Sequence, residues 1–209
     1  MTKSEDQTRE KIVLSALALF SERGISKTTV SEVAFHAGVT RVTVYRYFSE
    51  KKELVRAAHL RVEQVFQKGL ADLEQNSLAD WESVLNQIGE GLSALPSGDV
   101  SARSDELKRL YPDIYNAIQE VRVATLNGIF DHLSAMAEFQ GLLRPGLNRS
   151  IVHTVFWELA INFFDNPRFK SFGLSDAELY HAMTDILLYG VLGSRPTRTK
   201  TAVRRSQAV

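Results

Sequence analysis

The amino-acid sequence predicts an all-α protein of about nine helices, with an N-terminal three-helix unit of the helix-turn-helix type and a larger C-terminal helical domain. Apolar side chains recur three and four positions apart along most of the chain, which is the spacing of a helix with one buried face. Motifs of the form Thr/Ser-x-x-Glu at Thr29 and Ser175 are typical of helix starts. Only residues 39–48 (VTRVTVYRYF) have the β-branched and aromatic composition of a strand.

The first helix is predicted over residues 8–23, because its apolar side chains form one stripe. These side chains are Ile12, Val13, Ala16, Leu17 and Phe20. Gly24 follows the stripe and suits a left-handed helix cap. A second, short helix is expected to begin at the capping box formed by Thr29 and Glu32.

The spacing around Gly38 indicates that the strand-like stretch is a helix. Two short helices that cross at a sharp angle need a small residue where they touch, here Ala34. The turn needs a residue that tolerates positive φ, here Gly38, and the second helix needs an apolar anchor, here Val44. Val39 and Phe48 would pack inward with Val44. Arg41, Thr43, Arg46 and Tyr47 would then face outward. Tertiary packing thus overrides local β-propensity.

The rest of the chain continues as helices from Glu50, after a capping Ser49. Residues 147–164 are strongly apolar, and a capping box at Ser175 starts the last helix. Residues 194–209 hold too few apolar side chains to pack, so we expect a disordered tail. We therefore divide the chain into a helix-turn-helix domain (1–48), a helical body (49–193) and this tail.

Composition narrows the class of protein. The 209 residues are 44% hydrophobic and 24% charged, as in an ordinary globular protein, and include no cysteine for a disulfide or thiolate site. A polar N-terminus and the lack of an apolar run of about 20 residues predict a cytoplasmic protein outside the membrane. The net charge of zero divides into +3 for residues 1–56, −8 for 57–193 and +5 for 194–209. A basic end attached to an acidic body suggests two modules, only one of which would tolerate a polyanion.

Residues 17–55, LALFSERGISKTTVSEVAFHAGVTRVTVYRYFSEKKELV, resemble the DNA-binding domain of the TetR-type (tetracycline-repressor-like) bacterial transcription regulators. The resemblance lies in the aromatic-plus-Gly exit from the first helix, the Thr-capped second helix, the Ala–Gly–Val turn, and Tyr-x-Tyr-Phe followed by Lys-Lys-Glu-Leu. The remaining chain is similar only in being helical, with LYPDIY near its middle and two apolar helices near its end. The resemblance implies a DNA-binding regulator.

Two groups of side chains would share the work on DNA. Arg41 and Arg46 suit guanine edges, while Val42 suits a thymine methyl group. Phosphates would be held by hydroxyls, by backbone amides at a helix start and by Lys51; the resemblance implies that Tyr45 and Lys51 contact phosphate. The candidate DNA-binding residues are Thr29, Ser31, Thr40, Arg41, Val42, Thr43, Tyr45, Arg46, Tyr47 and Lys51. Capping explains Thr29 and Ser31 equally well, Tyr45 also suits a half-buried packing position, and the two arginines also suit solvent or phosphate.

Dimerisation and ligand binding would fall to the helical body. Residues 147–164 and 177–192 are apolar on more than one face, so they suit either a four-helix bundle between two subunits or the core of one. A pocket between helices would be mostly apolar, as would a plain core. Its candidate residues are Trp81, Leu85, Tyr111, Tyr115, Ile118, Arg122, Phe130, Phe156, Trp157 and Phe163. Arg122 would suit an acidic ligand or face solvent.

Enzyme chemistry finds little support. Residues 89–94 match a dinucleotide fingerprint formally, but no strand precedes them. Glu178-x-x-His181 lacks the second motif that a di-iron bundle requires, and the five histidines show no metal-site spacing. We expect no catalytic residue, metal or cofactor.

The sequence therefore predicts a ligand-responsive transcriptional regulator, foremost a repressor that binds a palindromic DNA operator as a homodimer and is released by a small molecule. Its partners would be double-stranded operator DNA, a small-molecule effector and a second copy of the chain. An activator or a ligand-independent regulator is the alternative, and a helical enzyme or small-molecule carrier is a more distant one.

Overall fold

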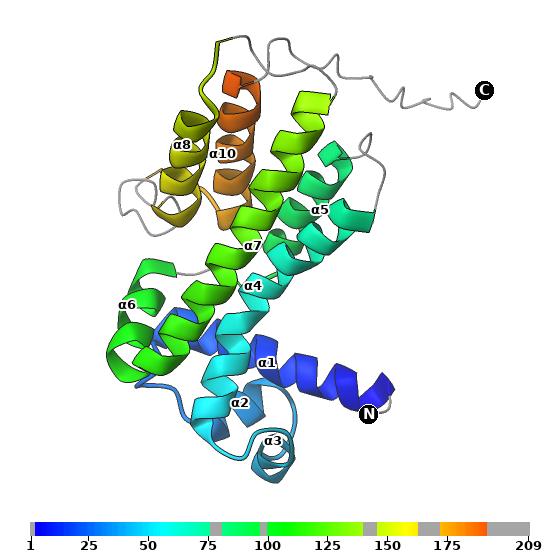
Figure 1. Cartoon of the computed structure of the whole chain (residues 1–209). Coiled ribbons are helices and arrows are strands. Elements are labelled where there is room, and N and C mark those ends of the chain that lie inside the picture. Colours follow the sequence, from blue (N-terminus) through cyan, green and yellow to red (C-terminus); the bar gives the residue numbers. More distant parts are fainter. Residues whose placement is uncertain (1–2, 76–80, 97–99, 140–145, 163–171, 192–209) are drawn as a thin grey trace, which may run out of the picture.

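The computed structural model describes residues 3–75, 81–96, 100–139, 146–162 and 172–191, and within these ranges it contains nine α-helices and no strand (Figure 1). The helices are α1 (Lys3–Arg23), α2 (Val30–His36), α3 (Arg41–Tyr47), α4 (Lys51–Gln75), α5 (Trp81–Ser93), α6 (Val100–Leu110), α7 (Pro112–Phe139), α8 (Arg149–Asn162) and α10 (Asp176–Val191). The predicted all-α fold is confirmed. The expected tail, residues 194–209, lies outside the described residues.

The molecule is elongated, and α4 connects its two ends (Figure 1). Helices α1, α2 and α3 gather at one end, while α8 and α10 lie side by side at the other. Helix α4 packs against α1 near the first end and against α5 and α7 within the body. Within the described ranges, no helix combines the length and hydrophobicity that crossing a lipid bilayer requires.

The expected capping residues set the starts of the short helices. The Thr29 hydroxyl accepts a hydrogen bond from the Glu32 amide at 3.2 Å, and the Glu32 carboxylate accepts one from the Thr29 amide at 2.7 Å. Thr40 caps α3 in the same manner, since its hydroxyl accepts from the amide of Thr43. Gly24 and Gly38 have φ values of +88° and +63°, which few other residues tolerate. The predicted caps and the glycine turns of this unit are confirmed. Tyr47, which was expected to face outward, is instead partly buried against the apolar core.

The predicted starts of the longer helices agree less closely with the structure. Helix α1 begins at Lys3, before the predicted start at residue 8. The prediction missed these first turns because they are polar and carry no apolar stripe. Helix α4 begins at Lys51, one residue after the predicted start, and the Glu53 carboxylate accepts a hydrogen bond from the Ser49 amide. The capping box at Ser175 is present at the start of α10.

One buried apolar cluster joins the N-terminal helices to the body. Val44 and Phe48 lie in it, as predicted, while Val39 is partly buried against it. The cluster also contains Leu54, Val55 and Ala58 of α4, and Leu107, Ile114 and Ile118 of α6 and α7. The expected first domain ends at residue 48, but its buried core continues into α4. The domain boundary there stays a prediction.

A second buried cluster fills the body between α4, α5, α7 and α10. It includes Val65 and Leu73 of α4, Ile88 of α5, Ile129 of α7 and Met183 of α10. Because α4 contributes side chains to both clusters, a shift of α4 against the body also displaces the surface that holds α1, α2 and α3.

Two valines of α3 provide a matched test of this packing. Val44 is 1% exposed, whereas Val42 is 80% exposed two positions earlier. We expect Val44→Ala to lower the free energy of unfolding by roughly 2 kcal/mol, because two buried methyl groups are lost and a cavity remains. Val42→Ala should change it by less than about 0.5 kcal/mol. Urea denaturation followed by circular dichroism measures both; equal losses would contradict the orientation of α3.

Candidate nucleic-acid interface and ligand cavity

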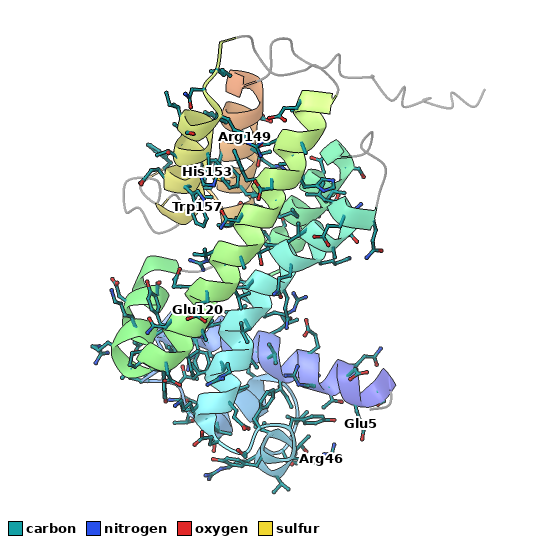
Figure 2. All side chains as sticks on the ribbon, in the orientation of Figure 1. Glu5, Arg46, Glu120, Arg149, His153 and Trp157 are labelled. Carbon is teal, nitrogen blue, oxygen red and sulfur yellow. The ribbon has the colours of Figure 1, made fainter. Side chains whose placement is uncertain are left out.

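Helix α3 presents a polar and basic face to solvent. Val44 anchors the inner side, while Arg41, Val42, Tyr45 and Arg46 are exposed. Arg46 lies at the α3 end of the elongated molecule, far from Arg149, His153 and Trp157 at the other end (Figure 2). The outward face of α3 is thus accessible to a large partner such as a nucleic acid.

Both arginines of α3 lie over a tyrosine ring of the same helix. The guanidinium carbon of Arg41 is 5.3 Å from the ring centre of Tyr45, and that of Arg46 is 5.2 Å from the ring centre of Tyr47. In each pair a guanidinium nitrogen also lies 3.4 Å from the tyrosine hydroxyl. These contacts restrict the arginine side chains to the exposed face, where cation–π attraction is worth about 0.5–1 kcal/mol.

Several of the candidate hydroxyls already take part in helix caps. The Thr29 hydroxyl donates to the Glu32 carboxylate at 2.8 Å, and these hydrogen bonds from Thr29 hold the pKa of Glu32 below its ordinary value. The hydroxyls of Thr40 and Thr43 lie 2.9 Å apart. Ser31 is exposed in the first turn of α2. Capping therefore accounts for the threonines, and DNA contact would be an additional role.

Lys51 lies in the first turn of α4, where the sequence placed it, but its side chain turns inward. Its ammonium donates a hydrogen bond to the carbonyl of Ile25 at 2.6 Å. Burial lowers the pKa of Lys51, and the carboxylates of Glu106 and Glu32 act in the opposite direction. The lysine thereby ties the start of α4 to the loop between α1 and α2.

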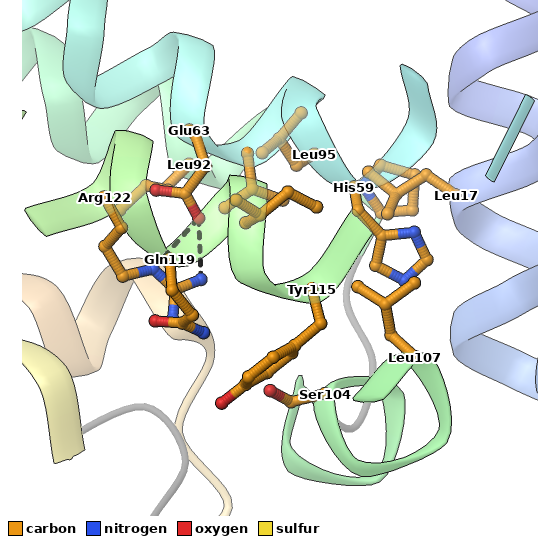
Figure 3. A pocket seen from close by; sticks show the side chains of 13 residues that line it. Leu17, His59, Glu63, Leu92, Leu95, Ser104, Leu107, Tyr115, Gln119 and Arg122 are labelled. Carbon is orange, nitrogen blue, oxygen red and sulfur yellow. Dashed lines mark hydrogen bonds and ion pairs between the residues drawn. The ribbon is translucent and has the colours of Figure 1, made fainter. Parts of the chain in front are cut away.

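A cavity of about 70 Å³ lies between α1, α4, α5, α6 and α7 (Figure 3). Of the expected pocket residues, Tyr115, Ile118 and Arg122 line it. Its other lining residues are Leu17, His59, Val62, Glu63, Leu92, Leu95, Pro96, Ser104, Leu107 and Gln119. Leu17 belongs to α1, so this cavity directly adjoins the N-terminal core. An apolar cavity that holds benzene has a volume of roughly 150 Å³. The present cavity is smaller, so it must open to admit a ligand of that size or larger.

Glu63 and Arg122 form an ion pair in the wall of this cavity. The Oε1 atom of Glu63 accepts hydrogen bonds from Nε and Nη2 of Arg122, at 3.0 and 2.6 Å. Glu63 is only 2% exposed. Figure 3 shows this pair on one side of the cavity, opposite Leu17 and Leu107. Arg122 was expected in the pocket from the sequence. Glu63 was not, because its position on α4 gave no signal of a partner on α7.

The remaining expected pocket residues lie elsewhere. Leu85 and Phe156 line a second cavity of about 70 Å³ with almost wholly apolar walls, between α4, α5, α7, α8 and α10. Tyr111 packs against the first buried cluster. Phe130 contacts the rings of Phe156 and His153, and the indole nitrogen of Trp157 donates to His153 and Asn127. Phe163 and the side chain of Trp81 lie outside the described residues. The structure thus distributes one expected pocket over two cavities.

The formal enzyme motifs have structural roles. Residues 89–93 lie inside α5, not in a loop after a strand. The Glu178 carboxylate accepts from the amide and hydroxyl of Ser175 as part of a helix cap. In the described part of the chain, no three His, Cys, Asp or Glu side chains lie close enough to hold a metal ion.

Residues 12–58 match the family model of the bacterial regulatory proteins, tetR family. Over these residues the chain therefore has a domain of the TetR type. The match spans most of α1, all of α2 and α3, and the start of α4, so it contains the exposed face of α3 described above. The resemblance noted in the sequence is confirmed.

Curated relatives align with the same TetR-type domain. The HTH-type transcriptional repressor BepR of Brucella suis is 42% identical over 57 residues, which cover 27% of this chain and 27% of BepR. The HTH-type transcriptional regulator AcrR of Shigella flexneri is 48% identical over 54 residues, 25% of each chain. The chain thus aligns with about a quarter of the length of these relatives. Both relatives are named as transcriptional regulators.

A solved structure is similar in fold over most of the chain. The ketosteroid transcriptional regulator KstR2 of Mycobacterium tuberculosis superposes with a TM-score of 0.59 at 20% identity, over 89% of this chain and 95% of KstR2. At this identity the similarity establishes the helical architecture of the body and leaves its ligand open.

The Glu63–Arg122 pair yields a stability prediction. We expect Arg122→Met to lower the free energy of unfolding by roughly 3 kcal/mol, because it leaves the buried Glu63 carboxylate without its cation. Glu63→Met combined with Arg122→Met should cost less than Arg122→Met alone. Arg56→Met provides the control, since Arg56 pairs with the half-exposed Asp113 and should lose less than about 1 kcal/mol. Urea denaturation that ranks Arg56→Met as equally costly would refute the prediction.

Proposed function

We propose that this protein is a ligand-responsive transcriptional repressor. It binds a palindromic operator as a homodimer in the bacterial cytoplasm, and a small molecule releases it. The observation that carries this proposal is the outward face of α3, which combines Arg41 and Arg46 with an 80% exposed Val42 on a helix anchored by the buried Val44. Repression is the direction named for BepR.

The chemistry of α3 suits the major groove of DNA. A guanidinium binds O6 and N7 of guanine with two hydrogen bonds, and a valine methyl packs against the methyl of thymine. Arg41 and Arg46 would supply the former contact and Val42 the latter. Tyr45, Tyr47, Thr29, Ser31 and Lys51 surround this face and would hold phosphates. For Lys51 this requires its ammonium to leave the carbonyl of Ile25.

An exposed apolar surface on α8 and α10 supports the dimer. Leu147, just before α8, and Ile151 and Val155 within it recur four positions apart, and each is at least 40% exposed. Ile186 of α10 is 65% exposed, and α10 contacts α8. A second copy of these two helices would bury both sets of side chains in a four-helix bundle across a two-fold axis.

Ligand entry into the cavity beside Leu17 provides the proposed switch. The recognition helices of a dimer must lie about 34–36 Å apart to enter successive major grooves. A ligand larger than the present cavity separates α4, α6 and α7, which hold the N-terminal core, and so favours a different separation of the two α3 helices.

Selection of bound fragments from random-sequence DNA at physiological salt tests the proposed DNA reading. We expect the wild type to enrich a palindrome, and Arg46→Ala to lose or relax one position in each half-site, since a bidentate guanine contact is worth about 1–3 kcal/mol. Lys27→Ala is the control, because it removes an exposed cation of the same domain outside α3. It should leave the selected sequence unchanged. Enrichment of no sequence by the wild type would refute the proposal.

The dimer is tested by placing a charge on its surface. We expect Ile151→Asp to yield monomers in analytical ultracentrifugation and to weaken operator binding at least tenfold, because a buried unpaired carboxylate opposes association. Ile151→Leu keeps the apolar contact and should remain dimeric. A dimer that tolerates Ile151→Asp at micromolar concentration would place the interface elsewhere.

A further inference from the structure

A carboxylate of the body holds the loop between α1 and α2 by three hydrogen bonds. Glu106 of α6 accepts from the backbone amide of Ile25 at 2.6 Å, from the amide of Ser26 at 3.0 Å and from the hydroxyl of Ser26 at 2.7 Å. About 80 residues of sequence separate the partners, so this is a tertiary contact between the body and the helix-turn-helix unit.

The peptide of Ile25 lies between the body and the start of α4. Its amide donates to Glu106, and its carbonyl accepts from the ammonium of Lys51 at 2.6 Å. The side chain of Ile25 is buried in the first cluster, so the peptide has little freedom to turn. Glu106, Ile25 and Lys51 therefore form one chain of contacts from α6 to the first turn of α4.

Gly24 permits this close approach. A Cβ atom at this position would meet Oε2 of Glu106 at 2.8 Å, and the φ value of +88° disfavours other residues independently. Burial alone would raise the pKa of the Glu106 carboxyl, but the hydrogen bonds from Ser26 and Ile25, with Arg109 nearby, together hold it below its ordinary value of 4.5. The carboxylate is therefore charged at neutral pH, where charge-assisted hydrogen bonds are strongest.

Helix α6 also reaches the cavity. Ser104 and Leu107, on either side of Glu106 in sequence, line the cavity beside Leu17. Leu107 is in addition part of the buried cluster that the N-terminal helices share. The same short helix thus touches the space that a ligand would enlarge and the loop that leads into α2.

We propose that Glu106 is a positioning residue that fixes the orientation of the helix-turn-helix unit on the body, and thereby the separation of the two recognition helices in the dimer. The inference rests on the proposed function, because it concerns how a dimer matches its operator. The carboxylate grips two successive backbone amides, so rotation of the unit about the end of α1 requires these hydrogen bonds to break. A ligand that displaces α6 releases or redirects the unit through the same contact.

The spacing between operator half-sites provides the test. One added base pair moves a half-site by about 3.4 Å and rotates it by roughly 35°. A rigidly oriented dimer discriminates strongly against this change, whereas a loosely oriented dimer discriminates weakly. We therefore measure the affinity of the full chain for the selected palindrome and for versions with one base pair added or removed, by fluorescence anisotropy. A residue that only stabilises the fold would change all three affinities by the same factor.

We expect the wild type to lose at least about tenfold in affinity per inserted or deleted base pair, and Glu106→Gln to lose less than about threefold. Glu120→Gln is the matched control, because it makes the same chemical change at an exposed site on α7 and should keep the wild-type preference. Hydrogen exchange at the amides of Ile25 and Ser26 should accelerate in Glu106→Gln alone.

Each outcome decides between the proposals. A wild type without any selected palindrome would refute the proposed function and this inference with it. A wild type with a sharp spacing preference that Glu106→Gln retains would overturn the inference and leave the proposed function standing. If Glu106→Gln fails to fold, Ser26→Ala removes the hydroxyl contact alone and should weaken the spacing preference in the same direction. An unchanged preference in Ser26→Ala would then overturn the inference.

Discussion

The burial of Val44 and Phe48 in the cluster shared with α1, α2 and α4 holds the outward face of α3 in place. Helices α2 and α3 have seven residues each, which is too short for stability in isolation. Capping by Thr29 and Thr40 fixes where they start, but only tertiary packing keeps them helical. The exposed positions of α3 can therefore carry arginines without loss of fold stability, because the inner side of the helix supplies that stability. This division explains how a strand-like sequence forms a helix with an exposed basic face.

Helix α4 transmits this arrangement to the body. Its 25 residues span about 37 Å, with Lys51 near the α3 end, Glu63 in the cavity wall and Leu73 in the second cluster. The two cores therefore share one continuous helix, and α6 adds a second connection through Leu107 and Glu106. A rigid connection of this kind converts a local change in the body into a displacement of the entire N-terminal unit.

Local signals in the sequence were sufficient for the helix-turn-helix unit. Capping boxes, the positive φ of Gly24 and Gly38, and the inward valine are all encoded within about ten residues of one another. The contacts that join the unit to the body were not visible in the sequence. Glu106 meets Ser26 across 80 residues, and Glu63 meets Arg122 across 59. An isolated glutamate on a helix is typical of a solvated surface, so its pattern gives no indication of a distant partner.

The sequence likewise contained no indication of which expected pocket residues would share a cavity. Tyr115, Ile118 and Arg122 line one cavity, whereas Leu85 and Phe156 line a different one. Helical periodicity identifies which side of a helix is buried, but the neighbour across the interface depends on helix crossing and offset. An aromatic residue such as Phe130 then fills a core position as readily as it would contact a ligand.

The ion pair between Glu63 and Arg122 has a consequence for selectivity. It gives the cavity a polar wall without a net charge. A carboxylate or phosphate that enters must take Arg122 from Glu63 and leave that carboxylate buried without its cation, which costs several kcal/mol. An uncharged molecule meets no such penalty. Acidic metabolites, which are abundant in any cell, are therefore poor competitors for this space, and the proposed sensor gains discrimination from what its wall rejects rather than from what it attracts.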